Sequence, residues 1–262
     1  MKPAAVTFLG TGTSHGVPMI ACDCAVCRST DPRDKRLRPS IFLDVPSYAR
    51  ILVDAGPDLR QQALTFGVKH VDAILLTHSH ADHILGLDEV RRFNVITGNP
   101  IPCYASPETW ETVWRTFHYI FDGVQRKGGG VPKIDAHEIR RPLTIKGVHV
   151  VPVPVWHGDM PVLGFRFGDF AYLTDCNRID ESSMALVAGV DTLVIDALRE
   201  RPHVTHFSVD EALGVIGQLK PRRAYMTHMT HDLGHAATCA RLPPGVELAY
   251  DGLVLDVRVD VE

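Results

Sequence analysis

The segment 78–83 has the sequence His-Ser-His-Ala-Asp-His, so three imidazoles and one carboxylate fall within six residues. Burying these groups for packing alone would be costly, because each of them needs a polar partner. Neutral imidazole and carboxylate are instead ligands that suit zinc, manganese and iron. The segment follows an apolar stretch at 73–76, and a turn after a strand lets neighbouring side chains point in two directions. We therefore expect His78, His80, Asp82 and His83 to serve two metal ions, since a solvated loop seldom concentrates histidine in this way.

A second cluster of ligand-type residues is formed by Cys22, Cys24 and Cys27, in the pattern Cys-x-Cys-x-x-Cys. Such close spacing in a reducing compartment favours metal ligation over disulfides. A structural zinc ion takes four ligands, so a fourth must come from elsewhere in the chain. A redox pair and simply reduced cysteines are the alternatives. The remaining cysteines are isolated in the sequence and are expected to be small apolar residues: Cys103, Cys176 and Cys239.

Short, β-branched apolar runs bounded by Gly, Pro, Asp or Asn predict the strands that must position these clusters. They lie at 5–10, 41–45, 51–54, 73–77, 148–155, 164–167, 171–174, 192–196, 224–227 and 254–257. Helical patterns lie between them, at 58–66, 108–117, 181–187 and 208–219. In the last of these, Ser208 and Glu211 have the spacing of a capping box. Many strands with few helices predict a layered α/β or α+β architecture.

Several of the predicted strands end directly in a polar residue that could do chemistry. These residues are Asp54, His78, Asp175, Asp196 and His228. Polar groups that gather at strand ends are typical of an active site, so we expect these side chains to lie near one another.

Length and composition are those of a globular protein: 262 residues, 45% hydrophobic and 22% charged. No linker, repeat or low-complexity tract divides the chain, so we expect a single domain over 1–262. The net charge of −4 argues against duplex nucleic acid or an anionic membrane as partner. No stretch approaches the roughly 18 consecutive apolar residues of a membrane span, and the first residues carry no cleavage signature. These features predict a cytoplasmic protein.

The order of the clusters resembles that of the metallo-β-lactamase superfamily. Its signature is similar to residues 77–83, its later ligands match His157, Asp175 and His228, and its earlier strand-end aspartate matches Asp54. The resemblance spans almost the whole chain. It implies an α/β (α+β) fold, the αβ/βα four-layer sandwich of two mixed sheets flanked by helices, with metals at one edge.

The resemblance also implies a ligand set for two divalent ions, zinc or manganese. One ion would be bound by His78, His80 and His157, the second by Asp82, His83 and His228, and both by Asp175. Asp54 is better suited to orienting a metal ligand or the loop backbone than to binding a metal ion itself. Two adjacent metal ions can activate water and stabilise an anionic transition state, which is hydrolase chemistry.

The cysteine cluster narrows the resemblance to the family of phosphodiesterases that accompany carbon–phosphorus lyase, the PhnP family. That family pairs the dinuclear site with a Cys3His zinc, and His231, three residues beyond His228, is our candidate for the fourth ligand. The opening turn at 8–18 is also similar. A family histidine that contacts phosphate corresponds to His206, for which we expect a role as general acid. The expected catalytic residues are thus Asp82 and His206.

These features predict a dinuclear metal-dependent hydrolase, most simply a phosphodiesterase acting on small cyclic or nucleotide-like phosphodiesters. A tRNA-processing endoribonuclease and a thioester or lactone hydrolase share the fold and are the alternatives. A non-catalytic metal-binding protein is the alternative from another class, but all seven ligand positions are filled. A small phosphodiester is therefore the expected partner, and homodimers are common in the resembling families.

Residues 105–134 are the stretch whose role the sequence leaves open. Trp110, Trp114 and Phe117 have the spacing of a core-facing helix, although they could instead stack on a base. The glycines at 128–130 could act as a hinge that lets this segment cover the metals. We expect the segment to influence the choice of substrate.

Overall fold

Two seven-stranded mixed sheets face each other in the computed structural model, which describes residues 1–124 and 130–262. The first sheet has the order β14 (Val254–Val259), β1 (Lys2–Gly10), β2 (Ser40–Asp44), β3 (Arg50–Val53), β4 (Ala73–Leu75), β5 (Ile101–Ala105) and β6 (Ile134–Glu138). The second has the order β13 (Val246–Leu248), β12 (Arg223–Thr227), β11 (Thr192–Asp196), β10 (Phe170–Leu173), β9 (Met160–Phe167), β8 (Val148–His157) and β7 (Leu143–Ile145).

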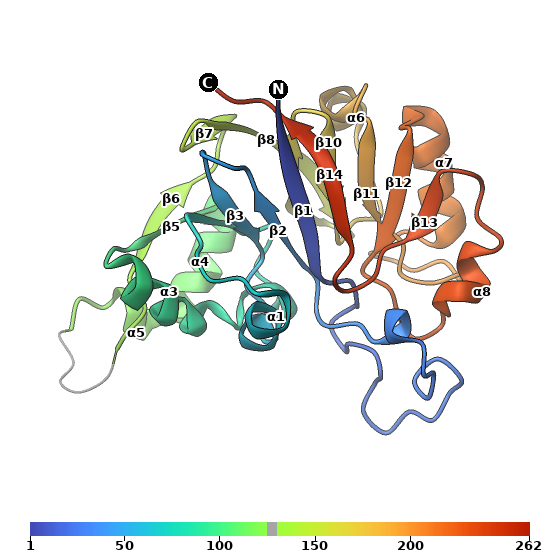
Figure 1. Ribbon diagram of the computed structural model, residues 1–262, viewed down its shortest axis with the longest axis horizontal. Helices are drawn as coiled ribbons and strands as arrows, with labels where there is room; N and C mark the ends of the chain where they lie inside the picture. The colour runs from blue at the N-terminus through green and yellow to red at the C-terminus, as the bar shows by residue number, and fades with distance from the viewer. Residues whose placement is uncertain (125–129) are drawn as a thin grey trace.

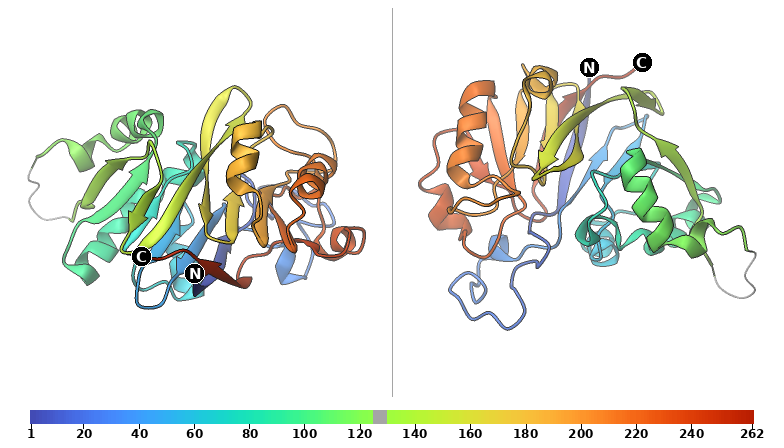
Figure 2. Two further views of the ribbon diagram at one scale, coloured as in Figure 1. Left: turned by 90° about the horizontal axis from the view of Figure 1, so that it is seen from above. Right: turned by 180° about the vertical axis from the view of Figure 1, so that it is seen from behind.

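Helices cover the outer face of each sheet, which makes four layers (Figures 1 and 2). On the first sheet lie α1 (Leu59–Phe66), α3 (Val90–Thr97) and α4 (Pro107–Thr116), followed by α5 (His118–Phe121). On the second lie α6 (Glu181–Val187), α7 (Val209–Leu219) and α8 (His235–Cys239). Three further turns are short: α2 (Ala81–Ile84), η1 (Pro32–Asp34) and η2 (Leu87–Glu89). The predicted four-layer sandwich is therefore confirmed.

Three apolar clusters hold the layers together. The central cluster fills the space between the sheets and includes Phe8, Leu43, Phe165 and Tyr172, all fully buried. Of the other two clusters, one packs the first sheet against its helices and includes Trp110. The other packs the second sheet against its helices. Burying both faces of a sheet explains why its strands are continuous apolar runs rather than alternating ones.

The strands bring their carboxyl ends to the same edge of the molecule. In the first sheet, β3 and β4 are parallel. In the second, β10, β11 and β12 are parallel, and β8 runs in the same direction because it is antiparallel to β9, which is antiparallel to β10. The residues that follow these strands therefore lie close together at that edge. Both termini lie at the opposite end from the long β1–β2 loop (Figure 1).

Each of the ten predicted strands and four predicted helices has a counterpart whose ends differ by at most four residues. The capping box is present: Ser208 Oγ accepts from the Glu211 N–H, and the Glu211 carboxylate accepts from the Ser208 N–H at 2.8 Å. Strands β5, β6, β7 and β13 were not predicted. Three of them have only three to five residues with mixed polarity, and β5 contains a proline, so local patterns do not identify them.

The segment 105–134 contains α4 and α5 as well as the start of β6. Trp110 is fully buried and donates from Nε1 to the His137 carbonyl, and Phe117 is also buried. Trp114 stacks on Trp110 but remains 43% exposed. The core-face interpretation thus holds for two of the three aromatic residues. Of the predicted glycine hinge, 128 and 129 lie outside the described residues.

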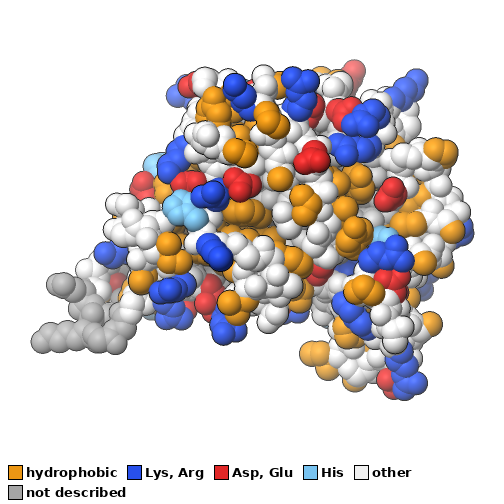
Figure 3. All heavy atoms as spheres, viewed as in Figure 1, with side chains coloured by type: hydrophobic (Ala, Val, Ile, Leu, Met, Phe, Trp, Pro, Cys, Tyr) orange, Lys and Arg blue, Asp and Glu red, His pale blue; other side chains and the backbone are white. Residues whose placement is uncertain are grey.

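Charged side chains of both signs are interspersed over the face seen in Figure 3, with no extended patch of a single sign on that face. This agrees with the small net charge of −4. Within the described ranges, no helix is both long and apolar enough to span a bilayer.

Candidate metal centre

Three of the predicted site residues have left-handed backbone conformations at the ends of strands. Asp54 follows β3 with φ 65°, Asp175 lies just beyond β10 with φ 53°, and His228 follows β12 with φ 61°. For residues other than glycine this conformation costs about 1 kcal/mol or more, and such strain concentrates at functional sites. The conformation turns the chain sharply at the strand end, so each side chain points into the edge shared by the two sheets.

Asp175 lies at the centre of the cluster. Its Oδ1 is 3.1 Å from His228 Nε2 and 3.9 Å from His78 Nε2, and its Oδ2 is 3.1 Å from His83 Nε2. Asp82 Oδ2 lies 3.5 Å from His83 Nε2 and 3.6 Å from His228 Nε2. Zn–N bonds of about 2.0–2.1 Å separate the ligand atoms around one ion by roughly 3–3.5 Å. The spacing of these atoms is therefore that of a coordination shell.

The same imidazole nitrogens lack hydrogen bonds. Nε2 of His78, His83 and His228 is buried, and none of them has a hydrogen-bond partner among the described residues. Buried polar atoms are rarely left in this state, so each such atom calls for an explanation. A metal ion would supply the missing partner for all three. The donor set therefore fits a divalent metal.

His78, His80 and His157 form a second group of rings. Their centroids are 4.6 Å apart for His78 and His80, 5.1 Å for His80 and His157, and 5.8 Å for His78 and His157. The three come from two sheets, because His78 and His80 follow β4 whereas His157 ends β8. Three imidazoles gathered in this way could hold one ion, next to the group around Asp82 and Asp175.

The second nitrogen of several imidazoles is held by a neighbour, and this determines which nitrogen faces the centre. His83 Nδ1 is 2.8 Å from Asp54 Oδ2, and His157 Nδ1 is 2.8 Å from the Thr205 carbonyl. His78 Nδ1 is 3.0 Å from Thr77 Oγ1, which itself donates to Asp54 at 2.9 Å. With the proton on Nδ1, the lone pair of Nε2 faces the cluster, as metal ligation requires.

The charges of the site are unbalanced. Burial lowers the pKa of His78, His80 and His157, that of His157 to about 4, which keeps them in the neutral form that binds metals. Burial acts in the same direction on His83 and His228, but the carboxylates around them outweigh it and raise both pKa values. These two groups thus respond to an excess of buried negative charge. A divalent cation would neutralise that excess.

His206 lies beside this cluster and is buried. Its ring is 4.5 Å from that of His157 and 4.8 Å from that of His228, measured between centroids. Its Nδ1 is 2.7 Å from Oδ2 of Asp196, a fully buried carboxylate that also accepts the Cys176 N–H. The pairing orients the ring and leaves Nε2 for a substrate atom. An imidazole so held can transfer a proton at the edge of the metal site.

The cysteine cluster and His231 come together although they lie more than 200 residues apart in sequence. His231 Nδ1 is 3.1 Å from Cys22 Sγ, 3.4 Å from Cys24 Sγ and 3.5 Å from Cys27 Sγ. Bonds of about 2.3 Å to sulfur and 2.0–2.1 Å to nitrogen separate such ligand atoms by roughly 3.5 Å around a tetrahedral zinc. Among the four, a hydrogen bond from the Cys27 N–H lowers the pKa of Cys24 to about 6. A group of this kind could hold one structural zinc ion.

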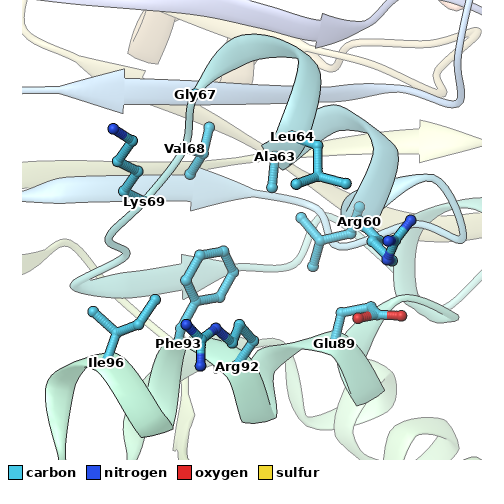
Figure 4. Close-up of a pocket in the computed structure, with 11 residues that line it drawn as sticks. Arg60, Ala63, Leu64, Gly67, Val68, Lys69, Glu89, Arg92, Phe93 and Ile96 are labelled. Carbon is cyan, nitrogen blue, oxygen red and sulfur yellow. The ribbon is translucent and has the colours of Figure 1, made fainter.

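An apolar groove elsewhere on the molecule contains none of the predicted site residues. It lies between α1 and α3, has a volume of about 590 Å³, and is lined by residues such as Leu64, Phe93 and Ile96 (Figure 4). Arg60, Lys69 and Arg92 are also among its lining residues. The groove therefore has no place in the chemistry described above.

The predicted ligand residues lie close to one another at one edge of the molecule. Their ligand atoms gather most tightly around Asp82, His83, Asp175 and His228, and separately around Cys22, Cys24, Cys27 and His231, whereas His78, His80 and His157 are related by the distances between their rings. Sequence reasoning gave no role to Thr77, Asp196 or the Thr205 carbonyl, which hold the second nitrogens of the histidines. Asp196 was recognised as a strand-end carboxylate, and that position was the one signal that could have identified its role.

Comparison with known proteins agrees with this geometry. Residues 49–229 match the model of the beta-lactamase superfamily domain. The crystal structure of a diphosphatase from the PhnP family superposes with a TM-score of 0.92 and is 43% identical, covering 99% of both chains. Zinc-bound PqqB from Methylobacterium extorquens has a TM-score of 0.77, covers 97% of this chain and all of that one, and at 22% identity shares the fold.

A curated relative from Porphyromonas gingivalis is described as an octanoyltransferase. It is 36% identical over 252 residues, which are 94% of this chain but 50% of that protein. This chain thus spans half of the length of that relative. The family match and the structural likeness agree: the chain belongs to the metallo-β-lactamase superfamily, and it is a metal-dependent hydrolase that resembles the PhnP family.

Proposed function

We propose that this member of the metallo-β-lactamase superfamily is a dinuclear phosphodiesterase that acts on small cyclic or nucleotide-like phosphodiesters. The observation that carries the proposal is the His206–Asp196 pair, with Nδ1 and Oδ2 2.7 Å apart, beside the rings of His157 and His228. A proton donor at this position is what the departure of an alkoxide from phosphorus requires. Likeness to a diphosphatase of the PhnP family supports chemistry at phosphorus.

Two groups of residues would hold the metals. His78, His80 and His157 would bind one divalent ion, zinc or manganese, and Asp82, His83 and His228 a second, with Asp175 between them. When bound, such ions supply positive charge to the phosphoryl oxygens and lower the pKa of a water molecule. One structural zinc ion would be held apart from the reaction, by Cys22, Cys24, Cys27 and His231.

The protein's own groups supply orientation and proton transfer. Asp54 keeps Thr77 and His83 in place, so the ligand nitrogens are held in position before substrate arrives. Asp196 holds the ring of His206 in place through the contact of 2.7 Å between its Oδ2 and Nδ1 of the ring. His206 then donates the proton of Nε2 to the leaving oxygen. Because His206 and Asp196 are both buried, bulk water is largely excluded from this pair.

Two substrates that differ in their leaving group test the assignment of His206. Bis(p-nitrophenyl) phosphate releases an anion that needs no proton, whereas adenosine 2′,3′-cyclic phosphate releases an alkoxide that does. His206→Ala should lower kcat on the cyclic substrate by about 10²–10⁴-fold and affect the nitrophenyl diester far less. Steady-state kinetics with protein of verified metal content provides the measurement. Equal losses on both substrates would rule out the general-acid role.

The wild-type protein, loaded in turn with zinc and manganese, should prefer bis(p-nitrophenyl) phosphate to the matching monoester. Absence of diester turnover by fully metallated protein would refute the proposal. Thioester and lactone hydrolysis would then be the reactions to measure, because the fold is shared with enzymes of that kind.

A further inference from the structure

One face of α1 and one face of α3 border the apolar groove between these helices, which has a volume of about 590 Å³ (Figure 4). The lining residues on each side follow a helical spacing of i, i+4 and i+7. On α1 and its C-terminal cap they include Arg60, Leu64 and Gly67, and on α3 and its N-terminal cap they include Glu89, Phe93 and Ile96. Residues at this spacing lie on one side of a helix, so each face extends along the groove for about 10 Å, or two turns.

Both buried and exposed apolar side chains line this groove. Val68 and Phe93 are buried, whereas Leu64 is 64% exposed and Ile96 is 47% exposed. Single exposed apolar residues are common on protein surfaces, but these two border the same concavity. A concave and mostly apolar surface of this size is typical of a binding site. Its lining residues include none of those assigned to the metal centre, so the groove calls for a ligand of its own.

Positive charge is concentrated around the groove. Its lining residues include three exposed cations, Arg60, Lys69 and Arg92, and one acidic residue, Glu89. Among the described residues, none of the three cations has an ion pair or a side-chain hydrogen bond. Figure 4 shows Arg60 and Glu89 at one end of the groove and Lys69 and Ile96 at the other. This local excess of positive charge, on a chain whose net charge is −4, is complementary to an acidic partner.

We propose that this groove binds an amphipathic helix of a partner protein, with apolar residues at i, i+4 and i+7 and acidic residues on both flanks. The apolar stripe would lie between the two helical faces and cover Leu64 and Ile96, which is the helix-in-groove mode of recognition. An alkyl carboxylate would bring only one charge, whereas the cations lie at both ends of the groove. A helix with acidic flanks can reach all of them. The inference does not depend on the proposed function, because it uses no residue of the metal centre.

Three designed peptides test the proposal on the full chain. The first is a fluorescein-labelled helix of about 15 residues, a length at which isolated helices begin to form, with a leucine stripe flanked by glutamates. The second contains the same residues in an order without a stripe, and the third has lysine in place of each glutamate. Fluorescence anisotropy gives the dissociation constants. We expect the acidic stripe peptide to bind with a dissociation constant on the order of 10 µM, and both control peptides about tenfold more weakly or worse.

Two substitutions in the groove, each with a matched control, locate the binding site. Leu64→Glu should weaken binding of the acidic peptide about tenfold or more, because it places a carboxylate against the apolar stripe. Val254→Glu makes the same change at an exposed position of β14 and should keep the wild-type affinity. Arg92→Glu should shift the preference toward the lysine peptide, whereas Arg115→Glu, on α4 outside the groove, should not. All four positions are exposed, and thermal midpoints close to that of the wild type would verify that the variants are folded.

Several results would overturn the inference. It is wrong if the acidic peptide does not bind at concentrations up to about 1 mM, or if the peptide without a stripe binds equally well. It is also wrong if Leu64→Glu keeps the wild-type affinity, because the peptide would then bind elsewhere. Binding of dansyl-labelled undecanoic acid without binding of the peptide would identify an acyl-chain site instead. Self-association that Leu64→Glu abolishes, again without binding of the peptide, would show that a second copy of this chain covers the groove.

Discussion

At the scale of single residues, the site is organised by the partners of its imidazoles. Each histidine has two nitrogens, and a hydrogen bond to one determines what the other can do. Asp54, Thr77 and the Thr205 carbonyl occupy Nδ1 of His83, His78 and His157, respectively. Asp196 does the same for His206. In the proposed function, identical side chains would thereby serve two different tasks, metal binding and proton transfer.

Asp196→Asn should show how far the proposed proton transfer by His206 depends on the Asp196 carboxylate. The amide keeps the size of the side chain but removes the carboxylate oxygen that contacts Nδ1 of His206 at 2.7 Å. We expect activity on alkoxide-releasing diesters to fall about 10–100-fold, with metal content unchanged. Kinetics on the cyclic and nitrophenyl diesters, beside metal analysis, provides the measurement. A similar loss on both substrates would mean that Asp196 supports the site as a whole instead.

His231→Ala tests the cysteine-bound zinc at the same scale. Three thiolates without a fourth protein ligand should bind zinc weakly, so the purified variant should contain one metal equivalent less per chain. Its thermal midpoint should also fall, because metal binding stabilises the folded loop. His118→Ala, which removes an exposed histidine on α5, is the control and should keep the full complement. Undiminished zinc in His231→Ala would exclude the proposed ligand set.

At the scale of elements, the β1–β2 loop must be attached to the rest of the molecule before its cysteines can meet His231. Arg36, buried in this loop, donates from Nη1 to the Thr230 carbonyl at 2.7 Å and from Nη2 to the Leu233 carbonyl at 2.5 Å. Asp251, before β14, accepts the Thr11 hydroxyl at 2.8 Å and the Leu37 N–H at 2.7 Å, and burial raises its pKa to about 7. These contacts fix the loop beside the segment that carries His228.

Arg36→Met should therefore be strongly destabilising although it keeps the apolar stem. Removing a buried guanidinium leaves the Thr230 and Leu233 carbonyls without its donors and removes the ion pair with Asp34, at a cost of about 3–5 kcal/mol. Arg33→Met removes an exposed ion pair with Asp31 and should leave the free energy of unfolding nearly unchanged. Urea unfolding of the two variants provides the comparison. Equal stabilities would contradict the role given to Arg36.

At the scale of the whole molecule, the metal centre joins the two sheets. Asp54, His78, Asp82 and His83 follow strands of the first sheet, whereas His157, Asp175 and His228 follow strands of the second. Ions bound between them would act as cross-links and would neutralise the excess of buried carboxylate charge. Stability of the sandwich and occupancy of the site are consequently linked.

Removal of metal should lower the thermal midpoint of the entire molecule. With ligands from both sheets left unpaired, we expect a fall on the order of 10 °C after treatment with a chelator, reversed by zinc or manganese. Calorimetry of metallated, stripped and reconstituted protein gives the measurement. An unchanged midpoint, with loss of the metals verified by elemental analysis, would show that the sheets do not depend on them.

The sequence alone was enough to predict which residues gather at the site and which strands precede them. The 78–83 cluster, the cysteine pattern and the strand-end residues are contiguous signals, as are the buried runs and the Ser208 capping box. Other features became visible only in the folded molecule: the neighbour that contacts each histidine, the contacts by which Arg36 and Asp251 attach the β1–β2 loop, and the pairing of the short strands β5, β6, β7 and β13. The physical reason is separation along the chain. A local pattern reflects the burial of adjacent residues, whereas the Asp54–His83 contact joins residues 29 apart, and the Arg36–Thr230 contact joins residues 194 apart. Such contacts exist only once the sheet order has brought the segments together.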